Sequence, residues 1–365
     1  MNIAVSAAAL RTSGALTIYK QFIEHLSEHV NGHKYFIFIS DGMPSPEIKG
    51  VTYIVTDCHS GVGRIWFDAF GLKHFFQKRG IKLYYVISLQ NTTINVAKYC
   101  KSILYYHQSI PFYPQKWNFL KREERRLFLY KYFYPIFVKA FLRKETKVIV
   151  QIPFIKRGFV NYFHHPGENV EVLFPDVEKI DVQQIEPLFV EKDYVHLIYP
   201  ATAFSYKNHK VLFDAIGIIV KTFPTEAKKI KLHITISRED CPKHIHEKII
   251  CNEITNNVSF DGVIPHKDLL RLYKAADALA FPSTVETLGL PLIEAASFGI
   301  PVFASNLDYA REVLAQYEGV TFIAPDDSKA WANAILELIR HQGIHYRPLE
   351  HQTNSSWKEF FNLIS

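Results

Sequence analysis

The sequence predicts an α/β protein built from two doubly wound, Rossmann-like domains, each a mainly parallel sheet covered by helices. In both halves of the 365-residue chain, apolar runs of strand length alternate with stretches of helical spacing. An acidic, irregular segment separates the halves at residues 176–193. The length itself corresponds to about two domains, each large enough for its own core.

The first half begins with an apolar run at residues 2–8, followed by a turn with helix-capping side chains at residues 12–14. Residues 15–30 then show the spacing of an amphipathic helix. We predict further strands at residues 35–39, 51–55, 83–87, 103–106 and 147–151. Such alternation predicts parallel strands with helices on both faces of the sheet.

The second half repeats the pattern. We predict strands at residues 195–199, 231–236, 258–260, 278–281, 302–304 and 321–323, and helices at residues 210–223, 267–275, 290–297, 309–316 and 328–341.

The predicted domains are therefore residues 1–175 and 194–345, joined by a linker at 176–193. A last amphipathic helix within residues 346–365 is expected to pack back on the first domain. Doubly wound folds bind ligands at the carboxyl ends of their strands, so we expect a site in a cleft where the domains face each other.

The composition is that of a soluble globular protein, with 48% apolar and 21% charged residues. Its four scattered cysteines do not form a disulfide framework and favour a reducing compartment. The first ten residues lack the charged start of a signal peptide, and no stretch approaches the ~20 apolar residues that span a bilayer. We expect a cytoplasmic protein that is soluble or peripheral at the inner face of the plasma membrane.

The positive charge is concentrated in the segment from Lys116 to Lys147, which holds ten basic and three acidic residues, against +6 for the whole chain. Nine aromatic residues are interleaved with these charges. Such a surface suits anionic lipid head groups with aromatic anchors, which makes an anionic membrane surface the favoured partner. A nucleic acid would also accept it, and a solvated helix face with inward aromatics is the alternative without a partner.

Residues 281–295, with the sequence FPSTVETLGLPLIEA, carry the strongest chemical signal. A buried strand ends in Pro-Ser, a loop presents Glu286, and Gly289 lets the backbone approach a ligand before a helix with Pro291 near its start. Amides at a helix start can receive a phosphate. Glu294 lies one turn into this helix, so one carboxylate can address a sugar near the phosphates and the other a ribose.

The Glu286 and Glu294 pair, with Phe-Pro-Ser before it and the Gly299-Ile-Pro-Val segment after it, resembles the nucleotide-sugar site of retaining GT-B glycosyltransferases of family 4, the glycosyl transferases group 1. Further segments with counterparts in that family are residues 13–14, His107, residues 151–156, 206–209, 260–264, 269–273 and 356–358. The resemblance thus covers nearly the whole chain and implies the GT-B fold.

The resemblance also implies donor-binding roles. Glu294 would bind the ribose hydroxyls, and the loop of Thr287, Leu288, Gly289 and Leu290 would receive phosphate oxygens on its amides. The backbone of Val263 and Ile264 would contact the base, although both residues are equally well explained as core residues. Gly14 would approach the diphosphate from the opposite domain, or simply make a tight turn.

The implied catalytic residues are Glu286, Lys207 and His107. Glu286 would support positive charge at the anomeric carbon, Lys207 would neutralise the departing diphosphate, and His107 would bind the donor sugar. A cation and oriented amides can meet that charge without a metal, and the sequence has no Asp-x-Asp motif. We therefore expect no cofactor and no catalytic metal.

One departure from the family's Gly-Arg-x4-Lys-Gly pattern concerns its arginine, because the matching positions read Ala201-Thr202-x4-Lys207-Asn208. Arg238 or Arg11 are the alternatives for reaching the phosphates. The cluster of Cys241, His244, His246 and Cys251 matches no common zinc spacing, so we do not predict a metal there. The Asn91-Thr92-Thr93 glycosylation pattern is interpreted as a loop.

The leading hypothesis is a hexosyltransferase that moves a sugar from a nucleotide-sugar donor to a growing, lipid-linked surface glycan of lipopolysaccharide or capsule type, without a nucleic-acid partner. A sugar-nucleotide epimerase is the second enzyme hypothesis. A non-catalytic module that binds a sugar nucleotide or a nucleic acid is the alternative from a different class.

Overall fold

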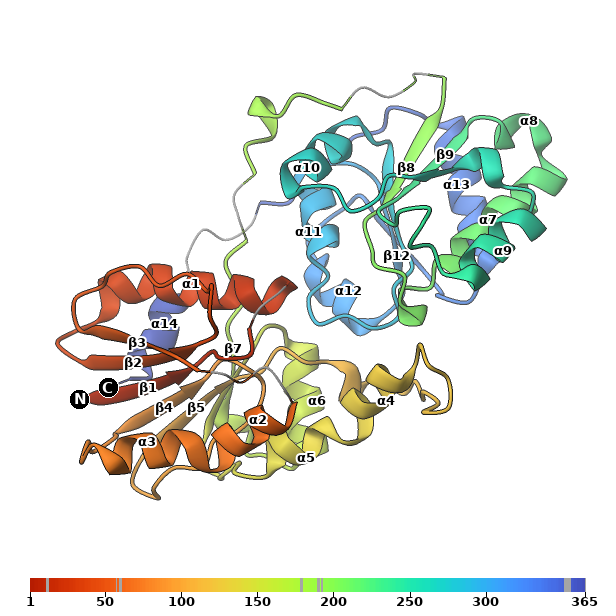
Figure 1. Ribbon diagram of the computed structural model, residues 1–365. Coiled ribbons are helices and arrows are strands. Elements are labelled where there is room, and N and C mark those ends of the chain that lie inside the picture. The colour runs from red at the N-terminus through yellow and green to blue at the C-terminus, as the bar shows by residue number, and fades with distance from the viewer. Residues whose placement is uncertain are drawn as a thin grey trace. The chain divides into compact units, whose positions relative to one another are not determined.

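The computed structural model describes residues 1–10, 13–56, 58, 61–177, 180–188, 191, 193–350 and 356–364. The chain forms two compact units, Met1–Val177 with Gln352–Ser365, and Glu178–His351 (Figure 1). The chain therefore leaves the N-terminal unit once and returns to it at its end.

The N-terminal unit is a sheet of seven parallel strands in the order β3-β2-β1-β4-β5-β6-β7. Its strands are β1 (Asn2–Ser6), β2 (Lys34–Ile39), β3 (Val51–Val55), β4 (Tyr85–Ser88), β5 (Lys101–Tyr105), β6 (Lys147–Val150) and β7 (Val170–Val172). Its helices are α1 (Ser13–His29), α2 (Gly61–Trp66), the π-helix η1 (Phe67–Gly71), α3 (Leu72–Lys78), α4 (Arg125–Tyr132), α5 (Tyr134–Lys139), α6 (Pro153–Phe163) and α14 (Trp357–Asn362). Figure 1 shows α1 and α14 over one face of this sheet and α2, α3 and α5 over the other.

The C-terminal unit has six parallel strands in the order β10-β9-β8-β11-β12-β13. Its strands are β8 (Val195–Tyr199), β9 (Ile230–Ile234), β10 (Val258–Phe260), β11 (Ala278–Phe281), β12 (Val302–Ser305) and β13 (Val320–Ile323). Its helices are α7 (His209–Thr222), α8 (Pro224–Ala227), α9 (Lys243–Cys251), α10 (His266–Ala275), α11 (Leu290–Ser297), α12 (Asp308–Val313) and α13 (Ser328–Arg340).

Both sheets have the doubly wound topology that the alternating pattern predicts. Strand order reverses between β1 and β4 in one sheet and between β8 and β11 in the other. Loops leave these neighbouring strands toward opposite faces, which opens room for a ligand at their carboxyl ends. The topology thus marks one edge of each sheet as the place to look for a site.

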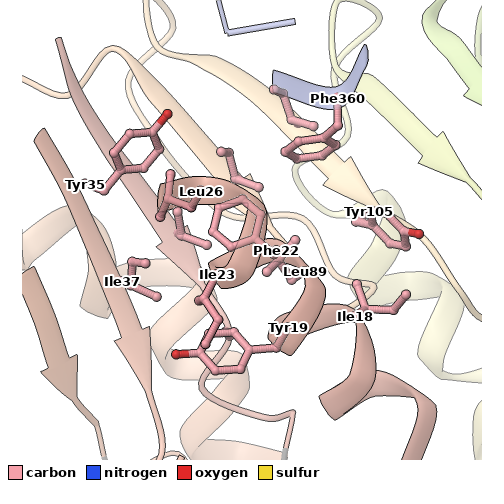
Figure 2. Packing of buried hydrophobic residues seen from close by; sticks show 14 of the residues in the cluster. Ile18, Tyr19, Phe22, Ile23, Leu26, Tyr35, Ile37, Leu89, Tyr105 and Phe360 are labelled. Carbon is pink, nitrogen blue, oxygen red and sulfur yellow. The ribbon is translucent and has the colours of Figure 1, made fainter. Parts of the chain in front are cut away.

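The N-terminal unit has a core on each face of its sheet, one against η1 and α3 and one against α1 and α14. Phe360 of α14 lies 6.0 Å from the Phe22 ring and 6.4 Å from the Tyr105 ring, and Trp357 stacks on Tyr105 at 5.7 Å (Figure 2 shows Phe22, Tyr105 and Phe360). Trp357, Phe360 and Phe361 are almost fully buried. The last helix is therefore part of the first unit's core.

The structure corrects the start of the first helix. Ser13 and Gly14 lie in the first turn of α1, whereas the sequence predicted a turn there. Thr12 and Arg11 lie outside the described residues.

Candidate active site

Lys207 and Glu286 lie at the point where the strand order of the C-terminal sheet reverses. The neighbouring strands β8 and β11 end at Tyr199 and Phe281. The loop after β8 carries Lys207 in a short 3₁₀ turn, and the loop after β11 carries Glu286. Parallel neighbours bring these loops to the same edge of the sheet, so residues 79 positions apart meet.

The two side chains form an ion pair, with Lys207 Nζ 2.5 Å from Glu286 Oε1. The side chains are only 16% and 14% exposed, so the pair is held mostly away from water. The Tyr199 hydroxyl donates to the Lys207 carbonyl, and burial together with the Glu286 charge raises the pKa of Tyr199 well above its ordinary value. Tyr199 is therefore a neutral donor that fixes the lysine backbone.

Thr284 joins the two loops. Its amide and its hydroxyl both donate to the Tyr206 carbonyl, at 2.8 and 3.0 Å. The register between the Lys207 loop and the Glu286 loop is therefore set by backbone contacts next to the ion pair.

Asn208 fixes the other side of the Lys207 loop. It adopts the left-handed conformation (φ +56°), which asparagine tolerates better than most residues. Its Nδ2 donates to the Pro325 carbonyl at 2.6 Å and to the Pro282 carbonyl at 3.3 Å. Asparagine in place of the family's glycine thus keeps the turn and adds two tethers.

Helix α11 begins directly after Gly289, which has a left-handed φ of +74°. A Cβ at this position would lie 3.2 Å from Leu292 Cδ1, so only glycine fits without displacing a neighbour. The loop is braced from α12, because the Tyr309 hydroxyl donates to the Ser283 carbonyl at 2.7 Å. Pro291 has no amide hydrogen and the Leu292 amide donates to the Gly289 carbonyl at 2.9 Å, so an anion at this turn would be met by the amides of Leu290 and the preceding loop.

Glu294 lies one turn further along α11. His266 Nε2 lies 2.9 Å from its Oε1, and burial and the Glu294 charge raise the pKa of Tyr273 well above its ordinary value. The Glu294 side chain is 12% exposed. Glu294 is thus held by α10, while Glu286 is held by the Lys207 loop.

Val263 is 92% exposed, so it is not a core residue of this unit. It follows Gly262, whose φ of +70° turns the chain after β10. Ile264 is half-buried. The exposure of Val263 removes the core alternative for this residue, and its contact with the base stays a prediction.

The other predicted residues belong to the N-terminal unit. Gly14 lies in α1, and His107 follows β5. Asn91 Nδ2 lies 2.8 Å from His107 Nε2. Burial and the nearby Arg64 charge lower the pKa of His107 to about 4, so the ring is neutral near pH 7.

Several residues to which the sequence pattern assigned no role support the site residues Lys207, Glu286 and Glu294. Tyr199, Thr284 and His266 hold Lys207, Glu286 and Glu294. His209 begins α7 fully buried, and burial and the Lys207 charge lower its pKa to about 3. Thr284 and His209 lie within the segments 281–295 and 206–209 but had no role assigned, whereas Tyr199 and His266 lie outside the segments that carried the resemblance.

The structure describes Thr202, which takes the place of the family arginine, and Arg238, one of the two arginines that could replace it at the phosphates. Thr202 is exposed, and the exposed Arg238 lies over the Phe260 ring at 5.1 Å. Arg11 lies outside the described residues. Among the described residues, no group of three or more His, Cys, Asp or Glu side chains is placed to hold a metal ion.

The basic segment folds mainly into α4 and α5, and its residues divide into two groups. Arg143 is internal, since it donates to the Lys98 carbonyl at 2.9 Å and to the Ser102 hydroxyl at 2.9 Å. Lys131 Nζ donates to the carbonyls of Pro111 and Tyr113, and burial lowers its pKa.

The second group is exposed. The exposed basic residues are Lys116, Lys121, Arg122, Arg125, Arg126, Lys139 and Lys144, and the exposed large hydrophobic ones are Phe119, Leu120, Leu129, Tyr132, Phe133 and Ile136. Leu127 and Val138 pack inward. Of the helices in the described ranges, none is both long and apolar enough to cross a membrane.

The two sheets and the residues at their edges define the class of protein. Residues 182–356, which make up most of the C-terminal unit, match the profile of the family described as Glycosyl transferases group 1. The two parallel, helix-covered sheets are those of the GT-B fold of glycosyltransferases.

Individual proteins resemble the chain at low identity. The O-antigen chain mannosyltransferase RfbU of Salmonella typhimurium is 25% identical over 208 residues, which are 57% of this chain and 55% of RfbU. The chain spans about half the length of the curated relatives it matches.

Solved structures share the fold at lower identity. WaaG, a glycosyltransferase involved in lipopolysaccharide biosynthesis, superimposes with a TM-score of 0.63 at 16% identity, covering 93% of this chain and 90% of WaaG. Anabaena Alr3699/HepE, solved with UDP and glucose, gives 0.61 at 14% identity over 93% and 90%.

Proposed function

We propose that the chain is a retaining glycosyltransferase that moves a hexose from a nucleoside-diphosphate sugar to a growing surface glycan. The observation that supports this best is the Lys207 and Glu286 pair beside the Gly289 turn. These groups supply a cation, a carboxylate and helix-start amides within one edge of one sheet. The proposed reaction needs the same three groups.

In the proposed reaction, the bond between the anomeric carbon and the diphosphate oxygen breaks while an acceptor hydroxyl forms the new glycosidic bond. The hydroxyl proton passes to the departing phosphate. Negative charge gathers on the diphosphate and positive charge on the sugar ring. Preorganised donors and charges in a partly buried site stabilise such changes strongly. Lys207 and the backbone amides of the Gly289 turn address the first charge, and Glu286 the second.

The ion pair also suggests how the donor is received. Without a ligand, Lys207 and Glu286 neutralise each other at 2.5 Å. An arriving diphosphate offers the lysine a second anionic partner, which leaves Glu286 to the sugar hydroxyls. Glu294 would bind the ribose, and the exposed backbone at Val263 the base.

The relatives support the choice of substrates. RfbU is an O-antigen chain mannosyltransferase, WaaG takes part in lipopolysaccharide biosynthesis, and HepE holds UDP and glucose. We infer a nucleotide-sugar donor and a lipid-linked glycan acceptor for this chain. Retention of configuration and independence of metal ions belong to the same proposal.

The test is donor screening followed by product analysis. Thermal shifts with UDP-, GDP- and ADP-sugars should select one donor, since a ligand at ~100 times its Kd stabilises by about 2.7 kcal/mol. Incubation with that donor and a glycan acceptor should give an α- or β-linked product that keeps the donor's anomeric configuration. Conversion of the donor without acceptor would indicate an epimerase, and binding without turnover would indicate a non-catalytic module.

We further propose that the exposed residues of α4 and α5 bind anionic lipid at the cytoplasmic face of the membrane, where a lipid-linked acceptor lies. Each exposed Lys or Arg near such a surface contributes ~1 kcal/mol, and Phe133 and Ile136 supply apolar anchors. The internal contacts of Lys131 and Arg143 remove both from this role.

A charge-matched pair of variants tests the membrane proposal. Arg122, Arg125 and Arg126 changed to Ser should release the protein from anionic vesicles. The same loss of charge at the exposed Lys221, Lys228 and Lys229 of the other unit should not. Equal vesicle binding by the two variants would refute the assignment to α4 and α5. Neutral vesicles serve as the lipid control.

A further inference from the structure

A buried polar loop, Gln90–Thr93, follows β4 at the point where the N-terminal sheet reverses its strand order. All four side chains are at most 8% exposed, although none is apolar. Burying polar groups costs free energy unless each is hydrogen-bonded. The cost is met here by a set of contacts that the proposed reaction does not itself require.

Asp68 clamps the loop on both sides of Asn91. Its Oδ1 accepts from Gln90 Nε2 at 3.0 Å and its Oδ2 from Thr92 Oγ1 at 2.7 Å. Arg64 donates to the Gln90 carbonyl and, at 3.0 Å, to Thr92 Oγ1. Asp68 lies in the π-helix η1, a rare element that often marks functional sites. The residue between the two clamped neighbours is thereby fixed.

Asn91 itself is left-handed, with φ +63°, and its side chain holds His107 at two points. Its Oδ1 accepts from the His107 backbone amide at 2.5 Å, and its Nδ2 lies 2.8 Å from His107 Nε2. The backbone amide can only donate, so the oxygen must face it and the NH₂ group must face the ring. An NH₂ group cannot accept, so His107 Nε2 is the acceptor.

We propose that Asn91 is a positioning residue that holds His107 as a neutral imidazole with its proton on Nδ1. The Asp68 clamp keeps Asn91 in place for this purpose. The consequence for catalysis rests on the proposed function. For a histidine that binds the donor sugar, the role that the family resemblance implies for His107, a ring that cannot become cationic adds no positive charge to a sugar that is itself becoming positive.

The groups around the ring act in the same direction. Arg64 of α2 is the nearby cation, and it lowers the pKa of His107 together with burial. Asp68 of η1 is paired with Arg64 at 3.9 Å and does not contact the ring in any described hydrogen bond. Tyr105 of β5, whose ring centre lies 6.1 Å away, and Tyr134 of α5 have raised pKa values and are neutral.

The test replaces the side-chain NH₂ group of Asn91 by a carboxylate oxygen. In Asn91→Asp, one carboxylate oxygen can still accept from the His107 amide, but the other can only accept where Nδ2 donated. His107 Nε2 must then carry a proton, and the ring gains an anionic neighbour that favours the cation. Histidine ¹⁵N NMR should find Nε2 unprotonated from pH 5.5 to 8 in the wild type and protonated at pH 7 in Asn91→Asp.

Asn95→Asp is the matched control. Asn95 lies two residues after the loop, and its Nδ2 donates to the Ala69 carbonyl at 2.9 Å. This variant adds the same charge and loses a similar bond, so its His107 spectrum should stay like wild type. A protonated Nε2 in the wild type, or the same spectrum in Asn91→Asp and wild type, would overturn the proposal.

A second variant keeps the proposal testable if Asn91→Asp does not fold. Asn91→Gly keeps the left-handed backbone and removes the side chain, so His107 should show a mixture of tautomers. With the donor identified, Asn91→Asp should lower kcat at pH 7 by roughly 10- to 100-fold, the scale on which partners of a functional imidazole act, and recover as pH rises. The spectra decide the tautomer even if the chain transfers no sugar, so the two proposals fail separately.

Discussion

Lys207 and Glu286 are each other's counter-ion in the unliganded protein, so a change in either acts on both. Glu286→Gln keeps the shape and removes the charge. We expect kcat to fall much more than donor affinity, because the charge is needed when the sugar carbon becomes positive. Steady-state kinetics beside calorimetric donor binding measure the split. Unchanged turnover would remove Glu286 from the reaction.

Lys207→Ala should lower turnover by at least ~100-fold, the scale on which one preorganised charge-stabilising donor acts. It also leaves the mostly buried Glu286 without its cation, so the melting temperature should fall as well. The double variant with Glu286→Gln should recover melting temperature but not turnover. Chelators should have little effect, and activity restored to a chelated sample by Mg²⁺ or Mn²⁺ would contradict the metal-free reaction.

His209 gives a prediction about acid. Its folded pKa of about 3 lies below the ordinary value of 6.5, because burial disfavours the charged ring. Protons therefore bind the unfolded chain first, so stability is complete above pH ~6.5 and falls as pH drops toward 3. His209→Phe should lose less melting temperature than wild type between pH 7 and 4.5. The same change at the exposed His345 should leave that slope unaltered.

At the scale of elements, the start of α11 depends on Gly289. Gly289→Ala forces a side chain into a left-handed backbone, at a cost of ~1–2 kcal/mol, and crowds Leu292. Gly343 has the same φ of +74°, and a methyl group there would meet nothing within 4 Å, so Gly343→Ala isolates the backbone cost. Denaturant unfolding should show the larger loss at position 289. Only Gly289→Ala should also raise the donor KM, and equal donor KM values would separate this turn from donor binding.

The arrangement of elements was largely predictable, because the buried strands of parallel α/β folds appear in the sequence as continuous apolar runs. Strands such as Val51–Val55 and Val195–Tyr199 have the predicted bounds. Helices α2 and α3 were not predicted. Val62, Ile65 and Trp66 of α2 have the spacing of one helix face, but these side chains are exposed rather than packed in the core. Strand β7 has three residues, too few for a recognisable alternation.

The candidate site was predictable where its residues are close in sequence, as in the Glu286 to Glu294 loop and helix. The site was not predictable where folding brings together residues that are far apart in the sequence. Asn91 and His107 are 16 positions apart, and no spacing connects them. The sequence does not distinguish Lys131 from the other basic residues of its segment; the structure does, because its Nζ donates to backbone carbonyls.

At the scale of the whole molecule, we expect the N-terminal unit to depend on α14 for its stability. Trp357 is 2% exposed among Phe22, His25 and Tyr105. Trp357→Ala should destabilise the N-terminal unit by ~3–5 kcal/mol, the usual cost of deleting a large buried aromatic side chain. Hydrogen exchange should report the loss in β1 and α1 while β8 and β11 stay protected. Equal exchange in both units would contradict the division of the chain into two units.

The return of α14 also sets an order of events during synthesis on the ribosome. Residues 1–177 emerge early, yet their core lacks Trp357, Phe360 and Phe361 until the whole second unit has been translated. At ~5–20 residues per second, this delay is roughly 10–40 s. The unit translated second is thus the first to have all of its elements, while the unit translated first has its strands but lacks α14 over one face. Nascent-chain chaperones have their longest opportunity to bind at that face.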